Sequence, residues 1–139
     1  MRHRKNSRGR QKITFSWVCF ARYSCILCLI FISYAKVTPI RDAVAVERIY
    51  LFGSYAYGTP DANSDYDFYV VLSDEAKPHE AISTIYHALH RMKDRASVDI
   101  LALSAERFDD RKRLLTLERK VANEGVLLYE QGRPDFRMA

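Results

Sequence analysis

The sequence predicts one α/β (α+β) domain, in which a small sheet is covered by helices mainly on one side. From residue 37 onwards, short β-rich apolar runs alternate with segments of helical periodicity. A chain of 139 residues is long enough for one modest hydrophobic core but not for two. The elements follow the order α-β-β-α-β-α-β, with no internal repeat.

Residues 1–36 are predicted to be an extension, and residues 37–139 the domain. The extension holds eight of the 22 Lys and Arg residues, none of the 17 Asp and Glu residues, and all three cysteines. The net charge of +5 therefore comes from the extension, and residues 37–139 carry −3. This distribution gives no strong indication that the domain binds nucleic acid, and it excludes a disulfide framework there.

Three interpretations of the extension stay open. Its basic head and apolar run, residues 13–35, are typical of a signal peptide or membrane anchor. Arg22 interrupts the run, however, and the remainder is shorter than the roughly 20 residues that span a bilayer. The segment can also be translated DNA upstream of the true start, or a cytosolic apolar helix. We expect a cytoplasmic domain, with membrane anchoring through residues 13–35 as the alternative.

The first half of the domain is predicted to hold one helix and two strands. A helix is expected over 37–47, because a Thr-Pro pair stands at its start. The apolar run 48–52 predicts a strand, and 57–64 is a loop rich in turn-forming residues. The segment 65–72 predicts a second strand, whose continuous apolar tail indicates burial on both faces.

The second half is predicted to hold two helices and two strands. Apolar residues at three- and four-residue spacing predict a helix over 79–94, and 97–103 reads as a strand. A long helix is expected from an N-cap at Ser104 to a stop at Gly125. Residues 126–130 are predicted to form a terminal strand or an apolar extension.

Asp65 and Asp67 are the first candidates for a functional site. Side chains two residues apart in a strand point to the same face, so these carboxylates project together. Two such charges repel where the dielectric constant is low, and a divalent cation between them relieves the repulsion. Oxygen ligands without nearby Cys or His favour Mg²⁺ or Mn²⁺ over Zn²⁺.

Two further features extend this site. Gly53 and Ser54 end an apolar strand, and such a turn brings backbone amides and a hydroxyl close to phosphate oxygens. Asp99 interrupts a third apolar strand, where a structural residue would be hydrophobic. It can join the other two acids at a metal and assist the deprotonation of an incoming hydroxyl.

The segment LFGSYAYGTPDANSDYDFYVVL, residues 51–72, resembles the G-S-x10-D-x-D signature of the DNA polymerase β-type nucleotidyltransferase superfamily. It is most similar to the small stand-alone domains called minimal nucleotidyltransferases (MNT). VDILAL and EGVLLYE, further along the chain, also resemble the family, so the likeness runs from about Val46 to Glu130. The resemblance implies the polymerase β-like nucleotidyltransferase fold, a small mixed sheet with helices on one side.

The resemblance also implies the roles of individual residues. Gly53 and Ser54 would bind the β- and γ-phosphates of a nucleoside triphosphate, with Ser64 as a further nucleotide-binding residue. Asp65 and Asp67 would bridge two Mg²⁺ ions, with Asp99 on the catalytic metal. The expected reaction is attack of a hydroxyl on the α-phosphorus, which transfers AMP from ATP and releases pyrophosphate.

One position departs from the family pattern. The residue before Gly58 is often Arg in this family, where a cation could assist the triphosphate, but it is Tyr57 here. Either another cation substitutes, with Lys77 and Arg107 as candidates, or the affinity for nucleotide is reduced.

The minimal nucleotidyltransferases that the chain resembles commonly lack an acceptor-binding domain of their own, and we expect the same here. The resemblance therefore implies a helical HEPN-type protein partner, which the chain would modify as the MNT antitoxin of a toxin–antitoxin pair, with a homo- or hetero-oligomer as the assembly. Two alternatives stay open: a non-catalytic module that neutralises its partner by contact, and a small-molecule nucleotidyltransferase of the aminoglycoside type.

Overall fold

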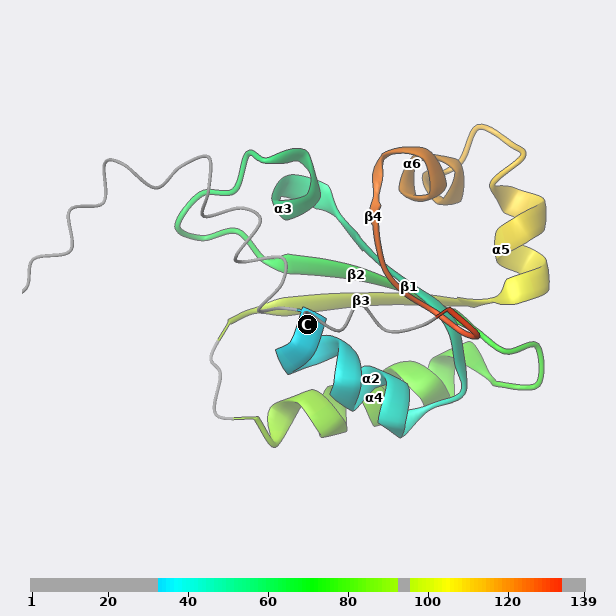
Figure 1. Ribbon diagram of the computed structural model, residues 1–139, viewed down its shortest axis with the longest axis horizontal. Coiled ribbons are helices and arrows are strands. Elements are labelled where there is room, and N and C mark those ends of the chain that lie inside the picture. The colour runs from blue at the N-terminus through cyan, green and yellow to red at the C-terminus, as the bar shows by residue number, and fades with distance from the viewer. Residues whose placement is uncertain (1–32, 93–95, 134–139) are drawn as a thin grey trace, which may run out of the picture.

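The computed structural model describes residues 33–92 and 96–133. The predictions made for residues 1–32, which include most of the anchor and all three cysteines, lie outside the described residues. The sheet has the strand order β3-β2-β1-β4, in which β2 pairs antiparallel with β1 and parallel with β3 (Figure 1). The predicted mixed sheet is therefore confirmed. Its strands are β1 (Val46–Phe52), β2 (Tyr66–Leu72), β3 (Val98–Ser104) and β4 (Val126–Glu130).

The helix predicted over 37–47 is shorter than expected and ends at Ala43. Val44 already has extended backbone angles, and β1 begins at Val46, which pairs with Leu72 and is buried. The β-branched Val46 belongs to the sheet rather than to a further helical turn. The helices are η1 (Ser33–Val37), α2 (Thr38–Ala43), α3 (Gly53–Tyr57), α4 (Pro78–His90), α5 (Ala105–Arg111) and α6 (Leu117–Glu124).

Helices cover both faces of the sheet, whereas the sequence placed them mainly on one side (Figure 1). Phe68 and Val70 of β2 belong to a core that α2 and α4 cover. Tyr69 and Val71 alternate with them and pack into a second core, which contains Phe108 of α5 and residues of α6. Since β2 is apolar on both faces, each face needs its own cover.

The long helix predicted from Ser104 to Gly125 is two helices, α5 and α6. The first of them ends at Arg111, whose carbonyl accepts a hydrogen bond of 2.7 Å from the hydroxyl of Thr116, the residue directly before α6. The connection turns away from the sheet, and Leu115 at its tip is 94% exposed. Helical periodicity alone did not show this break, because a hydroxyl that competes for backbone carbonyls leaves no mark on the apolar pattern.

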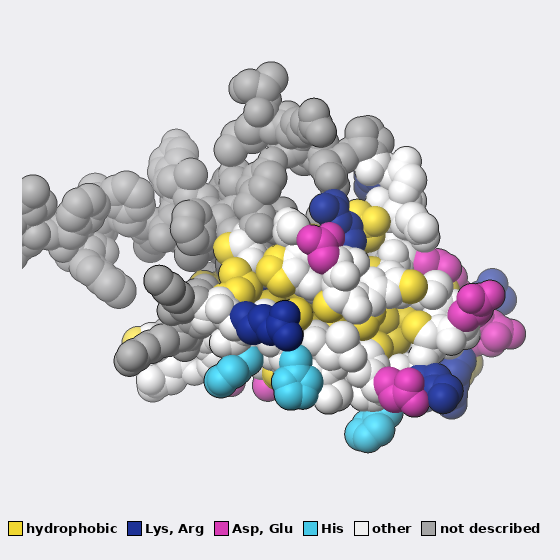
Figure 2. Space-filling model, turned by 90° about the horizontal axis from the view of Figure 1, so that it is seen from below, with side chains coloured by type: hydrophobic (Ala, Val, Ile, Leu, Met, Phe, Trp, Pro, Cys, Tyr) yellow, Lys and Arg dark blue, Asp and Glu magenta, His cyan; other side chains and the backbone are white. Residues whose placement is uncertain are grey.

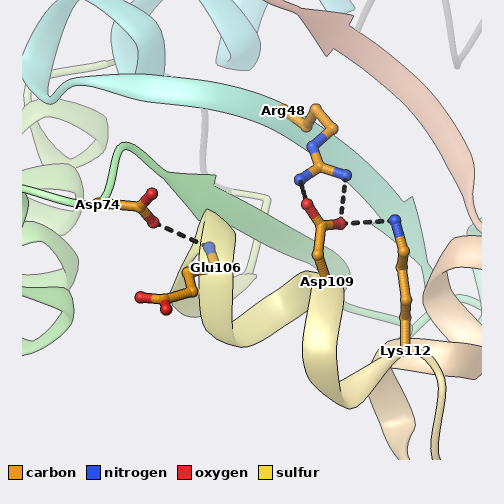
Figure 3. A network of polar contacts seen from close by, with 5 residues as sticks. All are labelled: Arg48, Asp74, Glu106, Asp109 and Lys112. Carbon is orange, nitrogen blue, oxygen red and sulfur yellow. Dashed lines mark hydrogen bonds and ion pairs between the residues drawn. The ribbon is translucent and has the colours of Figure 1, made fainter.

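Two contacts hold α5 in place, one from Asp74 after β2 and one from Arg48 of β1 (Figure 3). Ser104 occupies the N-cap position as predicted, but its side chain does not cap the helix. Instead, the Asp74 carboxylate accepts a hydrogen bond of 2.8 Å from the amide of Glu106. Arg48 of β1 donates two hydrogen bonds of 3.0 Å to Asp109, and Lys112 donates a third of 2.6 Å. A paired guanidinium and carboxylate thus join α5 to β1.

The opposite face of the sheet is covered by α4, which ends at His90 and is therefore shorter than the helix predicted over 79–94. Ile85 of this helix is fully buried, and Ile82 and Leu89 pack against the same core, so the predicted apolar stripe is confirmed. Its histidines point outward: His87 and His90 are exposed, and Figure 2 shows histidine side chains on this surface. Within residues 33–92 and 96–133, every helix falls short of the length and hydrophobicity that crossing a bilayer requires.

We predict that Asp109→Asn lowers the free energy of unfolding by about 1 kcal/mol at pH 7, because it removes the ion pair with Arg48. The loss is no larger because the Asp109 side chain is 39% exposed and solvent screens the pair. The hydrogen bonds from Arg48 lower the pKa of Asp109 below its ordinary value of 3.8. The pair therefore stabilises the fold above pH 3.8 and ceases to do so as the pH falls through the lowered pKa. Urea denaturation at pH 7 and pH 3 measures this difference.

The matched control is Asp110→Asn, which changes an exposed neighbour on the same helix. The prediction is contradicted if both variants lose the same stability, or if the loss in Asp109→Asn does not shrink at low pH.

Candidate active site

Asp67 and Asp99 stand directly opposite each other in the parallel pairing of β2 and β3. Paired residues on neighbouring strands project to the same face, and the strands lie about 4.8 Å apart. Asp65 directly precedes β2, where the amide of Tyr66 donates a hydrogen bond of 2.9 Å to the carbonyl of Ser97. The three predicted acids thus lie where two adjacent strands begin.

The charges of these carboxylates act on one another. Burial raises the pKa of Asp67 above its ordinary value, and the charges of Asp99 and Asp65 raise it further. Ionised Asp67 therefore opposes folding in the absence of a cation, and more strongly as the pH rises above 3.8. A positive charge bound at this place would remove that cost.

The three acids fit Mg²⁺ or Mn²⁺ by their chemistry, since they offer oxygen ligands and mutual repulsion that a divalent cation relieves. Their side chains do not form a ready-made cluster: in 33–92 and 96–133, no three His, Cys, Asp or Glu side chains are grouped as metal ligands. The metal-binding roles of Asp65, Asp67 and Asp99 therefore remain a prediction, which the register of the strands and the raised pKa support.

Gly53 is required because the turn after β1 lies against Asp67. Phe52, the last residue of β1, pairs with Asp67, and Gly53 follows with φ of 72°. A Cβ atom at Gly53 would overlap the Asp67 carboxylate oxygen and lie 3.0 Å from its Cγ. Only glycine combines this backbone conformation with so close an approach. The turn at Gly53 and Ser54, which is predicted to bind phosphate and is called the phosphate turn below, is therefore in direct contact with the predicted metal site.

The helix α3 carries this turn and is short. It ends at Gly58, which has φ of 75°, and the Thr59 amide donates a hydrogen bond of 3.0 Å to the Ser54 carbonyl. Tyr55 stacks on Tyr66 with ring centroids 4.0 Å apart, which fixes α3 against the start of β2. Ser54, the second predicted phosphate residue, thus lies in a helical turn packed beside the acids.

Ser64 has a structural role that the sequence did not reveal. Its hydroxyl accepts a hydrogen bond of 2.8 Å from the Asp61 amide and donates one of 3.2 Å to the Asp61 carboxylate. These bonds close the turn before Asp65. Contact of Ser64 with a nucleotide remains a prediction.

Lys77 and Arg107, the candidates for a substitute cation, lie at the wrong end of the sheet. They follow the ends of β2 and β3, whereas the acids lie at the starts of these parallel strands. At about 3.3 Å per residue, the five residues from Asp67 to Leu72 separate the two ends by about 16 Å. In addition, Lys77 pairs with Glu80 at 3.2 Å.

The structure instead brings Lys120 of α6 to Tyr57, with its Nζ atom 5.0 Å from the ring centroid. Sequence reasoning missed this residue, because it lies 63 positions away. The antiparallel pairing of β4 with β1 brings α6 to the end of β1, and the sequence carries no signal for this pairing.

Residues 36–133 match the sequence profile of the family described as polymerase beta, nucleotidyltransferase. The chain belongs to this polymerase β nucleotidyltransferase family. The resemblance seen in the G-S-x10-D-x-D segment is thereby confirmed, and the chain is a nucleotidyltransferase. The family assignment also agrees with the mixed sheet and its covering helices.

Several solved structures are similar to this nucleotidyltransferase. A candidate nucleotidyltransferase from Sulfolobus solfataricus is 22% identical, with a TM-score of 0.53 over 80% of this chain and 87% of that one; this likeness concerns the fold. A toxin–antitoxin structure with AMP-PNP is 25% identical, with a TM-score of 0.49 over 72% and 74% of the two chains. The toxin–antitoxin MntA–HpeT with two aspartate-to-glutamate substitutions is 24% identical, with a TM-score of 0.48 and the same coverage. Among curated proteins, none matches significantly.

We predict that Gly53→Ala destabilises the protein more than Gly58→Ala does. Both residues have positive φ angles, so each substitution costs about 1 kcal/mol of backbone strain. Only at Gly53 does the new methyl group also displace the Asp67 carboxylate, because the space around Gly58 is open. Chemical denaturation of the two variants measures the difference, and equal losses would contradict the close packing of Gly53 on Asp67.

Proposed function

We propose that this nucleotidyltransferase moves AMP from ATP to a hydroxyl group of a partner protein. The observation that supports this most strongly is the register of Asp67 opposite Asp99, with Gly53 packed on Asp67. This arrangement brings the start of two acid-bearing strands against the turn at Gly53 and Ser54, with Asp65 directly before β2. We also propose that the reaction is cytoplasmic, where ATP is available.

The residues of the site bind the triphosphate, hold the metal ions and accept a proton. The turn at Gly53 and Ser54 holds the β- and γ-phosphates and so orients the α-phosphorus. Asp65, Asp67 and Asp99 would hold the Mg²⁺ ions, which supply charge neutralisation for the phosphates and for pyrophosphate as it leaves. Asp99 accepts the proton of the acceptor hydroxyl, whose oxygen forms a bond to the α-phosphorus as the bond to the bridging oxygen breaks.

The position of Asp99 favours a large acceptor. It is exposed and lies on β3, which is an edge strand of the sheet. A protein surface can therefore reach this carboxylate from outside the domain without entering a cavity. In agreement with the resemblance to minimal nucleotidyltransferases, we propose a HEPN-type toxin as the acceptor and an antitoxin role for this chain.

The test is transfer of label from ATP to the product of the neighbouring gene in the presence of Mg²⁺. We expect label from [α-³²P]ATP on the partner and none from [γ-³²P]ATP, because the γ-phosphate leaves with pyrophosphate. Asp67→Ala and Asp99→Ala are each expected to reduce labelling about 100-fold or more, since each removes a ligand for the charge-neutralising metals.

The control is Glu75→Ala, which removes an exposed carboxylate beyond the other end of β2 and is expected to leave labelling unchanged. A partner that is neutralised but unlabelled would overturn the transfer reaction and support neutralisation by contact. Labelling of an aminoglycoside instead of the partner would overturn the protein acceptor.

A further inference from the structure

Lys120 occupies a defined place beside the phosphate turn, although its side chain is exposed. Its Nζ atom lies 5.0 Å from the centroid of the Tyr57 ring, within the range of a cation–π contact. Tyr57 is the last residue of α3 and is 38% exposed. The ring thus presents the ammonium group at the surface of the helix that begins with Gly53 and Ser54.

The position of α6, which carries Lys120, is fixed by buried contacts. Tyr69 of β2 donates a hydrogen bond of 2.8 Å to Glu118, which also pairs with Arg111 at 3.1 Å. Val121 is fully buried against the sheet. After the helix, Gly125 lies so close to β1 that a Cβ atom there would be 3.2 Å from the Leu51 carbonyl. The end of α6 is therefore held at the same end of β1 as the phosphate turn.

Helix geometry places the Tyr57 ring on the side of the phosphate turn. Tyr57 follows Ser54 by three residues, and residues at this spacing share one face of a helix. The rise over four residues is about 6 Å. A lysine side chain held on this ring can therefore reach a ligand bound at the first turn of α3.

The charge of the site favours a cation at this point. The carboxylates of Asp65, Asp67 and Asp99 concentrate negative charge beside Gly53, and a bound triphosphate adds more. Arg48, Arg111 and Lys112 are each engaged with carboxylates of α5 or α6. Lys120 is instead held by an aromatic ring, which leaves its ammonium protons able to donate to phosphate oxygens.

We propose that Lys120, positioned by Tyr57, binds the triphosphate of the nucleotide at the Gly53–Ser54 turn. This inference rests on the proposed function, and it assigns to α6 the cation that position 57 itself does not supply. Tyr57 is the positioning residue, and Lys120 is the nucleotide-binding residue. The pair would discriminate nucleoside triphosphates from monophosphates.

The test is calorimetric titration of the full chain with Mg²⁺ and a non-hydrolysable ATP analogue, and separately with AMP. We expect Lys120→Ala to weaken binding of the analogue about tenfold, the loss of one charge-assisted contact, and to change AMP binding less than twofold. The matched control is Arg119→Ala, which removes an exposed side chain next to Lys120 on the same helix and should bind the analogue like the wild type. Lys120→Arg should retain most of the affinity.

The double variant Lys120→Ala with Tyr57→Arg separates a charge effect from a structural one. It should regain affinity for the analogue, because the new guanidinium stands where the lysine was held. Unchanged binding in Lys120→Ala, an equal loss in Arg119→Ala, or failure of the double variant to recover would each overturn the inference. A wild-type chain that binds neither ligand would overturn the proposed function itself.

Discussion

The pairing of Asp67 with Asp99 is the constraint on which the rest of the site depends. Parallel pairing of β2 and β3 places these two carboxylates opposite each other, and the missing side chain of Gly53 allows the turn after β1 to reach one of them. The arrangement has a cost, because burial and neighbouring charges raise the pKa of Asp67. The apolar residues of β2, covered on both faces, hold the strand in place despite this repulsion.

The acids and the glycine could be predicted from sequence because their signals are local. A carboxylate pair at two-residue spacing before an apolar run, and Asp99 within another, both follow from the alternation of side chains in strands. The continuous apolar tail of β2 indicated burial on both faces, but the helices were predicted mainly on one side, because the apolar pattern of a helix does not say which face of the sheet it covers. The break between Arg111 and Leu117 contains a hydrogen bond from the Thr116 hydroxyl to a carbonyl five residues earlier, which hydrophobic periodicity does not record.

The cation beside the site could not be found by the same reasoning. Lys77 and Arg107 were chosen without the direction of the strands, and parallel pairing puts both at the far end of the sheet. Lys120 reaches Tyr57 only because β4 pairs antiparallel with β1 and brings α6 back to the phosphate turn. Contacts of this kind come from the order of strands, which a single sequence specifies only through its tertiary fold.

The most direct test of the metal–triphosphate site is a titration with Mn²⁺, followed by electron paramagnetic resonance, with the non-hydrolysable ATP analogue present. We expect bound Mn²⁺ in the wild type and in Glu75→Gln, and binding at least about tenfold weaker in Asp67→Asn and in Asp99→Asn, because each loses one charged ligand. If both aspartate variants bind Mn²⁺ as tightly as the wild type, the carboxylates paired at the start of β2 and β3 do not form the metal site.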